Sequence, residues 1–294
     1  MGLKRLAIRA LDRPGGRWLL AALATRYARG LTGRDVSVRY DDVWARGLDS
    51  RIFIPDSASF AYFPAQFLAF PERVKRMTES ARDFWFHVYE PRSSDVIIDL
   101  GAGVGFDTLV FSHAVGPTGR VIAIEAHPRT FRRLETLCRV NRLTNTTCLQ
   151  LAAVDSGRTV YIEDSAHHTA NSVGLLPSDS HVLEVEGLSL DEICRRQRIE
   201  RVDFLKMNIE GAERLAIQGM SDVIGRTSHV CIACHDFRAD GADGADGADG
   251  ADADSFSTRG PVMDFLRRSG FRVVSRPDDP RPYVRDHLHA VREA

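Results

Sequence analysis

Three glycines at alternate positions, Gly101, Gly103 and Gly105, form a loop that could hold a bound ligand. The run at 95–100 that precedes them is short, apolar and β-branched, which is typical of a strand buried on both faces. Glycine lets the backbone come close to a ligand, and a helix that begins after the loop presents unpaired amides and the positive end of its dipole. We therefore predict that main-chain amides of this loop bind one end of a ligand.

A carboxylate follows the loop at a spacing that fits a nucleoside. Glu125 closes a second apolar run roughly twenty residues beyond the loop, where a carboxylate in this topology accepts hydrogen bonds from both ribose hydroxyls. The third glycine of the dinucleotide fingerprint falls on Phe106, or on Thr108 if the frame is shifted, so the nicotinamide pattern is incomplete. Strand, loop, helix, strand and terminal acid in register favour a cofactor site over a simple tight turn.

Three further polar residues follow later apolar runs, at the edge where such sheets bind ligands. Asn208 and Glu210 come after one run, and His235 comes after the next. His235 is our candidate general base, because imidazole titrates near neutral pH and Asp236 could orient it. The structural alternatives are a histidine that caps the strand end and a glutamate that satisfies helix N-terminal amides. Asn208 weakens a metal-assisted mechanism, because an amide lacks the charge that holds a hard cation.

The segment CIACH at 231–235 matches the c-type haem attachment motif letter by letter. We reject that interpretation, because successive side chains of a buried strand face opposite ways and no secretory segment is recognisable. A zinc site is rejected too, since no second cysteine pair has ligand spacing, and we predict no metal. The five cysteines are odd in number and scattered, which fits a reducing cytoplasm better than a disulfide framework.

The elements that would position these residues alternate between strands and helices. Strands are predicted at 95–100, 120–125, 147–153, 202–208, 230–234, 271–275 and 287–291, and helices at 107–114, 128–142, 189–196, 211–219 and 261–269. A polar, β-rich stretch at 159–186 interrupts the alternation. Strands that alternate with helices predict an α/β fold with a doubly wound, parallel sheet.

Several of these blocks resemble the FkbM-type methyltransferases. The blocks are DLGAGVGFDT (99–108), IEAHP (124–128), SLDEI (189–193), DFLKMNIEGAE (203–213), FLRRSGF (265–271) and LHAV (288–291). The stretch at 206–213 is the most distinctive of them. Two departures stand out: Asn208 occupies a position where the family usually has aspartate, and a Gly-Ala-Asp repeat enlarges the segment after His235.

The resemblance implies a Rossmann-like class I methyltransferase with a mostly parallel seven-stranded sheet of order 3-2-1-4-5-7-6, flanked by helices, whose last strand runs antiparallel. It implies S-adenosylmethionine as cofactor, with binding residues Asp99, Gly101, Ala102, Gly103, Gly105, Phe106, Thr108, Glu125, Ala126 and Ala153. By analogy, the reaction is O-methylation of a hydroxyl on a sugar, glycolipid or secondary metabolite. His235, Asn208 and Glu210 are then the catalytic candidates.

Two other functions are compatible with the same residues. An NAD(P)-dependent oxidoreductase would bind nicotinamide on the loop despite Phe106. A catalytically inactive homologue would keep the nucleotide-binding fold without turnover, and Asn208 is the one residue that suggests it.

The chain divides into an N-terminal helical and irregular extension at 1–90, which would be a lid or a substrate-side layer, and a methyltransferase domain at 91–294. Within the latter, the Gly-Ala-Asp loop at 239–254 lacks large apolar side chains, so we expect it to be solvated and flexible. Calcium capture by its aspartates is the alternative, but the spacing matches neither an EF-hand nor a nonapeptide repeat.

Composition narrows the range of partners. A net charge of −1 gives no basic footprint for nucleic acid, and no apolar run reaches the roughly 18–20 residues that span a bilayer. The arginine-rich residues 1–34 could lie on an anionic membrane as an amphipathic helix, but a helix packed on the protein is the favoured interpretation. We expect a cytoplasmic enzyme that acts on a small-molecule or glycan hydroxyl.

Overall fold

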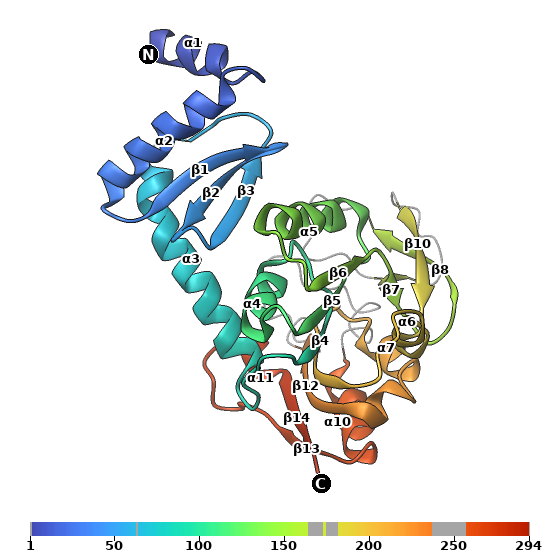
Figure 1. Ribbon diagram of the computed structural model, residues 1–294. Helices are drawn as coiled ribbons and strands as arrows, with labels where there is room; N and C mark the ends of the chain where they lie inside the picture. The colour runs from blue at the N-terminus through green and yellow to red at the C-terminus, as the bar shows by residue number, and fades with distance from the viewer. Residues whose placement is uncertain (1, 63, 164–172, 175–181, 237–256, 294) are drawn as a thin grey trace. The chain divides into compact units, whose positions relative to one another are not determined.

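The computed structural model describes residues 2–62, 64–163, 173–174, 182–236 and 257–293, and the chain forms two compact units (Figure 1). The N-terminal unit comprises Met1–Ser80 and Glu135–Leu143, and the larger unit comprises Ala81–Leu134 and Thr144–Ala294. The predicted loop at 239–254 lies outside the described residues. No helix among the described residues is long and apolar enough to cross a membrane.

The N-terminal unit contains an antiparallel sheet where the sequence predicted irregular structure. Its elements are α1 (Gly2–Leu11), α2 (Arg17–Thr32), β1 (Val36–Asp41), β2 (Val43–Leu48), β3 (Ile52–Ser57) and the first part of α3 (Pro64–Trp85). The sheet order is β1-β2-β3. Asp42, Asp49 and Ser50 adopt positive φ angles of 52–56° in the two connections, as tight hairpin turns require. These turn residues were the missed signal for a meander.

Helix α2 packs on this sheet through one face. Leu20, Ala24 and Ala28 are buried, and Thr25 accepts a hydrogen bond at Oγ1 from the Val38 amide of β1 (2.8 Å). The opposite face leaves Trp18 70% exposed. The buried stripe supports the prediction of a helix that is packed on the protein.

Aromatic rings form the centre of the N-terminal unit. Trp44, Phe60, Tyr62 and Phe67 make successive ring contacts with centroids 5.0–5.5 Å apart. Such tilted and edge-to-face pairs add to the stability gained from burial.

One cation is buried among these rings. Arg46 binds both carboxylate oxygens of Asp56, at 2.8 and 2.9 Å, and donates to the Gln66 carbonyl (2.7 Å). Its guanidinium carbon lies 5.1 Å from the Tyr62 ring centroid and 4.8 Å from that of Phe70. The pair is therefore satisfied by both hydrogen bonds and ring faces.

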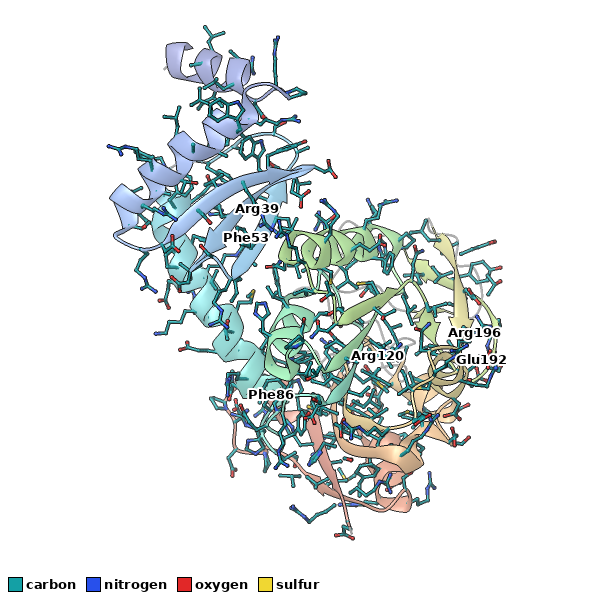
Figure 2. The ribbon with its side chains drawn as sticks, in the orientation of Figure 1. Arg39, Phe53, Phe86, Arg120, Glu192 and Arg196 are labelled. Atoms are coloured by element: carbon teal, nitrogen blue, oxygen red, sulfur yellow. The ribbon has the colours of Figure 1, made fainter. Side chains whose placement is uncertain are left out.

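A side chain of α5 (Pro128–Asn141) completes the edge of the three-stranded sheet. Asn141 accepts a hydrogen bond from the Phe53 amide and donates one to the Phe53 carbonyl, both at 2.7 Å. It thus replaces one residue of a neighbouring strand. Arg39 covers the ring of Phe53, with its guanidinium carbon 3.6 Å from the centroid (Figure 2). The segment 135–143 is in this way part of the N-terminal unit.

The larger unit is built on a seven-stranded sheet, as predicted for an α/β fold. Its strands are β4 (Val96–Leu100), β5 (Arg120–Ile124), β6 (Thr146–Leu149), β11 (Val202–Met207), β12 (Thr227–Ala233), β13 (Phe271–Val274) and β14 (His287–Arg292). The order is β13-β14-β12-β11-β4-β5-β6, which reads 6-7-5-4-1-2-3 by chain position within the sheet. Neighbours from β12 to β6 are parallel, whereas β14 is antiparallel to both β12 and β13. The sheet is therefore mixed, and β14 is the antiparallel last strand that the resemblance implied.

Both faces of this sheet are covered, which explains why its strands are apolar throughout. On one face, Ile98 and Leu205 join a cluster with residues of α6 (Leu190–Arg196), α7 (Glu213–Gln218) and α10 (Arg259–Arg268). On the other face, Ile97 and Phe204 pack with the end of α3 and with α4 (Phe106–Val115). A 3₁₀ helix η1 (Val223–Arg226) and the short α11 (Pro282–Arg285) complete the unit.

A second, smaller sheet corrects the predicted strand at 147–153. The chain leaves the large sheet after β6, and the two residues of β7 (Ala152–Ala153) pair in parallel with β10 (Val182–Leu188). With β8 (Arg158–Glu163) and β9 (Val173–Gly174) they form a sheet of order β7-β10-β8-β9. The predicted β-rich stretch at 159–186 supplies most of this sheet.

Candidate functional site

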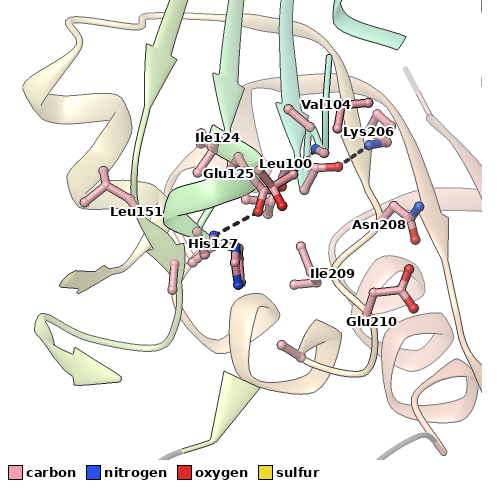
Figure 3. Close-up of a pocket in the computed structure, with 18 of the residues that line it drawn as sticks. Leu100, Val104, Ile124, Glu125, His127, Leu151, Lys206, Asn208, Ile209 and Glu210 are labelled. Atoms are coloured by element: carbon pink, nitrogen blue, oxygen red, sulfur yellow. Dashed lines mark hydrogen bonds between the residues drawn. The ribbon is translucent and has the colours of Figure 1, made fainter. Parts of the chain in front are cut away.

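A pocket of about 300 Å³ opens at the carboxyl ends of β4, β5 and β11 (Figure 3). The parallel register places Leu100 opposite both Ile124 and Met207, so these three strands end at one edge of the sheet. The volume lies at the lower end of the roughly 300–1,000 Å³ of small-molecule sites. Nine predicted site residues line it: Gly101, Ala102, Gly103, Phe106, Glu125, Ala126, Ala153, Asn208 and Glu210.

Two glycines of the loop are required for different reasons. Gly101 has φ 73°, and a Cβ atom there would lie 1.9 Å from the Asn208 carbonyl oxygen, so any side chain would displace the backbone that follows β11. Gly103 has φ 57°, but no atom lies within 4 Å of its Cβ position. Gly101 is thus needed for packing, whereas Gly103 leaves space beside the pocket.

Three amides of the loop donate hydrogen bonds within the protein. The amides of Gly101 and Ala102 both donate to the Ile124 carbonyl at 2.9 Å. The Gly103 amide donates to Glu125 Oε2 at 2.8 Å. These bonds fix the shape of the loop, so a ligand would meet a cradle that is already formed.

Glu125 lies in the pocket, as the sequence predicted for a ribose-binding carboxylate. Its Oε2 accepts from Gly103 and its Oε1 accepts from the His127 amide at 2.9 Å (Figure 3). Burial raises the pKa of Glu125, although the two amides and the nearby Lys206 favour the ionised form. A carboxylate has about four acceptor sites, so two remain for ligand hydroxyls while the amides hold its orientation.

A buried ion pair behind the loop was missed from the sequence. Lys206 of β11 and Asp99 of β4 are directly opposite each other, 1% and 0% exposed, with Nζ 2.8 Å from Asp99 Oδ1. Thr108 donates to the second carboxylate oxygen at 2.5 Å. Burial lowers the pKa of Lys206, but the carboxylates of Asp99 and Asp107 outweigh it, so the net shift is upward.

The lysine of this pair also binds the backbone of the glycine loop. Lys206 Nζ donates to the Gly101 carbonyl at 2.7 Å (Figure 3). Asp99 and Thr108, which we predicted to contact the cofactor, do not line the pocket. Instead, Asp99 pairs with Lys206, and Thr108 donates a hydrogen bond to Asp99. Gly105 does not line the pocket either, because it caps α4 with a φ of 90°.

A second missed residue, Asp107, lines the pocket in the first turn of α4. Burial and the neighbouring Asp99 raise its pKa to about 6, and Lys206 partly offsets them. A carboxylate that titrates near neutral pH beside a pocket is typical of functional sites. Asp107 could not be recognised from the sequence, since an acidic residue in the first turn of a helix is ordinary.

His235 lies outside the pocket wall, between two carboxylates. Its Nδ1 is 3.0 Å from Glu213 Oε1 and its Nε2 is 3.3 Å from Glu210 Oε2. Burial lowers the pKa of His235, but the two carboxylates outweigh it and raise the pKa to about 10. An imidazole with this pKa is protonated at neutral pH and cannot accept a proton there, which argues against the predicted role of His235 as general base.

Asp236 also differs from its predicted role. Its carboxylate accepts from the amides of Thr258 and Arg259, at 3.1 and 2.9 Å, at the start of α10. It therefore satisfies helix N-terminal donors and does not orient His235.

Glu210 is the carboxylate that connects His235 to the pocket. It lines the pocket and adopts a φ of 54°, a left-handed conformation that is uncommon outside glycine (Figure 3). Asn208, two residues earlier, lines the same wall of the pocket. Its backbone amide donates a hydrogen bond to the Leu100 carbonyl at 2.9 Å. Backbone strain of this kind concentrates at functional sites.

Comparisons with known proteins find one family model and similar proteins. The Methyltransferase FkbM domain model matches residues 99–273. The 31-O-demethyl-FK506 methyltransferase FkbM of Streptomyces tacrolimicus is 24% identical over 255 residues, which cover 76% of this chain and 90% of that protein. The crystal structure of methyltransferase FkbM from Methylobacillus flagellatus has a TM-score of 0.50 and 16% identity over 76% of this chain. The match covers 51% of that solved chain, so this protein spans about half its length.

Proposed function

The chain belongs to the FkbM methyltransferase family, whose model matches more than half of its 294 residues, and we propose that it transfers a methyl group from S-adenosylmethionine to a hydroxyl. The acceptor is a sugar, a glycolipid or a secondary metabolite. The name of the Streptomyces tacrolimicus relative, which specifies a 31-O-demethyl substrate, supports oxygen as the acceptor atom.

One observation supports the cofactor most directly: Glu125 lies in the pocket with its orientation fixed by two amides, beside the open space at Gly103. In the proposed complex Glu125 accepts hydrogen bonds from the ribose hydroxyls. Ala153 borders the adenine, and the loop around Gly103 approaches the amino-acid end. S-adenosylmethionine supplies a methyl group on a sulfonium, which an aligned nucleophile takes by in-line displacement.

Glu210 is the proposed proton acceptor for the substrate hydroxyl. Its carboxylate lines the pocket, and the protonated His235 lies 3.3 Å from its Oε2. Glu213, which is fully buried, holds the other side of the imidazole. His235 is thus a positioning residue that orients Glu210, and Asn208 contacts the acceptor from the same wall.

Calorimetry with S-adenosylhomocysteine and with NAD(P) tests the cofactor. We expect S-adenosylhomocysteine to bind with a stoichiometry of one and NAD(P) not to bind. Binding of NAD(P) alone would favour the oxidoreductase.

Mass spectrometry tests the reaction on a panel of hydroxylated sugars, glycolipids and secondary metabolites. We expect a gain of one methyl group on an acceptor, and no gain on the matched deoxy compound. Methylation of the deoxy compound would show that another atom is the acceptor, and failure of the whole panel with cofactor bound would favour an inactive homologue.

The Glu210→Gln variant tests the proton acceptor. General-base catalysis contributes about 10²–10⁴-fold, so we expect kcat to fall at least 100-fold while the affinity for S-adenosylhomocysteine changes less than threefold. His235→Gln should lower kcat by about tenfold. In the wild-type protein we expect kcat to decline as the imidazolium loses its proton near pH 10, and His235→Gln should abolish that decline. An unchanged kcat in Glu210→Gln would remove Glu210 from the mechanism.

A further inference from the structure

We propose that Cys231, His287 and His289 form a binding site for a zinc-type transition-metal ion, separate from the methyl-transfer pocket. Cys231 of β12 lies directly opposite His289 of β14, and Ala233 lies opposite His287. Side chains two apart on a strand share a face, so the register brings the thiol and both imidazoles together. One ligand atom from each lies within 4.8 Å of the others, and all three residues are buried. None of them lines the pocket.

The imidazole nitrogens of this cluster are the main support for a ligand. His289 is fully buried, and neither of its ring nitrogens has a hydrogen-bond partner among the described residues. His287 is 4% exposed, and its Nδ1 also has no hydrogen-bond partner in the part of the chain that the structure describes. A buried polar group without a partner has lost its hydrogen bonds to water without compensation, so three such nitrogens need a physical explanation. A bound cation would accept one lone pair from each of the two rings, while the remaining nitrogen of His289 would carry the proton.

The donor set indicates the class of metal. One sulfur and two imidazole nitrogens are typical ligands of Zn²⁺, whereas Ca²⁺ and Mg²⁺ require oxygens. Ligands 2.0–2.3 Å from a tetrahedral ion lie roughly 3.3–3.8 Å apart, so the cluster would contract by about 1 Å. Phe84 hydrogen-bonds to the His287 ring through its backbone, which orients the imidazole as outer partners of metal-bound histidines do.

The surrounding charges permit a cation at this position. Lys206 of β11 lies opposite Cys231 of β12 in the sheet, but its charge is neutralised by the ion pair with Asp99. Two further cations act on His287. The protonated His235 is held between Glu210 and Glu213, and Arg276 forms ion pairs with Asp83 (3.0 Å) and Asp279 (2.8 Å).

The protonation states are also suitable. Burial lowers the pKa of His287 to about 4 and that of His289 to about 3, so both rings are neutral and able to coordinate at pH 7. Burial raises the pKa of the Cys231 thiol, and coordination would displace its proton. Binding of one Zn²⁺ therefore releases one proton from the sulfur.

The expected consequence is structural. An ion held by β12 and β14 would join the last strand of the chain to the centre of the sheet. The exposed His87 lies beside the cluster, with its ring centroid 5.0 Å from that of His289.

Titration of the metal-free full-length protein with Co²⁺ tests the site, because cobalt reports its ligands by absorption. We expect one equivalent to bind, with a sulfur-to-cobalt charge-transfer band and the intense visible bands of a tetrahedral ion. One equivalent of Zn²⁺ should displace it and release a proton. Absence of the charge-transfer band in folded wild-type protein, or a stoichiometry well below one, would overturn the proposal. Neither readout depends on methyl transfer.

Matched cysteine variants locate the binding. Cys231 and Cys234 are both buried near the end of β12, but they belong to the clusters on opposite faces of the sheet. Cys231→Ala should lose the charge-transfer band, and Cys234→Ala should keep it. His289→Gln should weaken Co²⁺ binding by more than about 100-fold, since even loss of an outer partner costs 10–100-fold. A band that disappears in Cys234→Ala and survives in Cys231→Ala would contradict the assignment. Circular dichroism of the metal-free variants verifies folding.

Discussion

Each of the two compact units buries an ion pair, and the two pairs differ in what their cations hold. Arg46 of the N-terminal unit binds Asp56 through two hydrogen bonds and the Gln66 carbonyl through a third. Lys206 of the larger unit binds Asp99 and the carbonyl of Gly101. Both cations are nearly inaccessible, at 4% and 1% exposure.

The difference shows how similar chemistry supports either a core or a site. Arg46 is planar and forks onto a carboxylate between aromatic rings, so its hydrogen bonds end within the core of its own unit. Lys206 is a point charge, and one of its donors reaches the loop that lines the pocket. Substitutions at the two pairs should therefore both lower stability, but only those at Lys206 should affect cofactor binding.

The largest effect is expected from Lys206→Met, which leaves Asp99 as an unpaired charge with no solvent access. Removal of one partner of a buried pair costs about 3–5 kcal/mol, and the Gly101 carbonyl loses its donor as well. Urea unfolding should report the lost stability, and calorimetry should detect no S-adenosylhomocysteine binding.

A double variant separates the two consequences. Lys206→Met with Asp99→Leu removes both charges, so most of the unfolding free energy should return while cofactor affinity stays low. Recovery of full affinity in the double variant would show that Lys206 acts only through stability.

Arg46→Met should lower the unfolding free energy by about 2 kcal/mol. This is less than the loss for Lys206→Met, because Asp56 is 22% exposed and water can solvate it. S-adenosylhomocysteine affinity measured on the folded protein should change less than twofold. A larger change in affinity would break the contrast between the two pairs.

Gly103→Val should weaken S-adenosylhomocysteine binding at least 100-fold, since the branched side chain would enter the open space beside the pocket. The control is Gly33→Val in the N-terminal unit, where φ is 63° and no atom lies within 4 Å of the Cβ position. Both substitutions should cost about 1–2 kcal/mol of backbone strain by thermal unfolding. Unchanged affinity in folded Gly103→Val would remove the loop from the cofactor site.

The smallest effect is expected at Glu125. Glu125→Gln should weaken S-adenosylhomocysteine binding by about tenfold, because the amide keeps only one oxygen acceptor. Burial raises the pKa of Glu125, so the wild-type carboxylate is protonated at a higher pH than an exposed glutamate. Affinity should therefore decline as the pH falls through that raised pKa, and calorimetry across mildly acidic pH should find a flatter profile in the variant.

The fold of the larger unit was predictable because its signals are local. Apolar runs, the glycine loop and the polar residues at strand ends define strands, helices and the edge at which they meet. Glu125 could be placed in the pocket because it ends a strand that follows the loop. The break between β6 and β7 was missed because the apolar pattern continues through both segments while the pairing partner changes.

The contacts that control the site were not predictable, because they depend on register between distant strands. Lys206 meets Asp99 across a strand pair, and His289 meets Cys231 across another. His235 was judged by the pKa of a free imidazole, whereas two carboxylates from the segment around α7 determine its charge. A charged side chain within an apolar strand was the available signal for Lys206.

The position of Asn141 means that residues 1–80 do not make up the whole of the N-terminal unit. The side-chain amide of Asn141 forms hydrogen bonds with the backbone N–H and the backbone carbonyl of Phe53, although the two residues lie far apart along the chain. Deletion of residues 1–80 would leave Asn141 without its partner Phe53. Replacement of residues 1–80 by those of a homologue would restore the two hydrogen bonds only with an asparagine at position 141. Engineering of this region therefore has to exchange two stretches of sequence together, with α5 as the scaffold for the second.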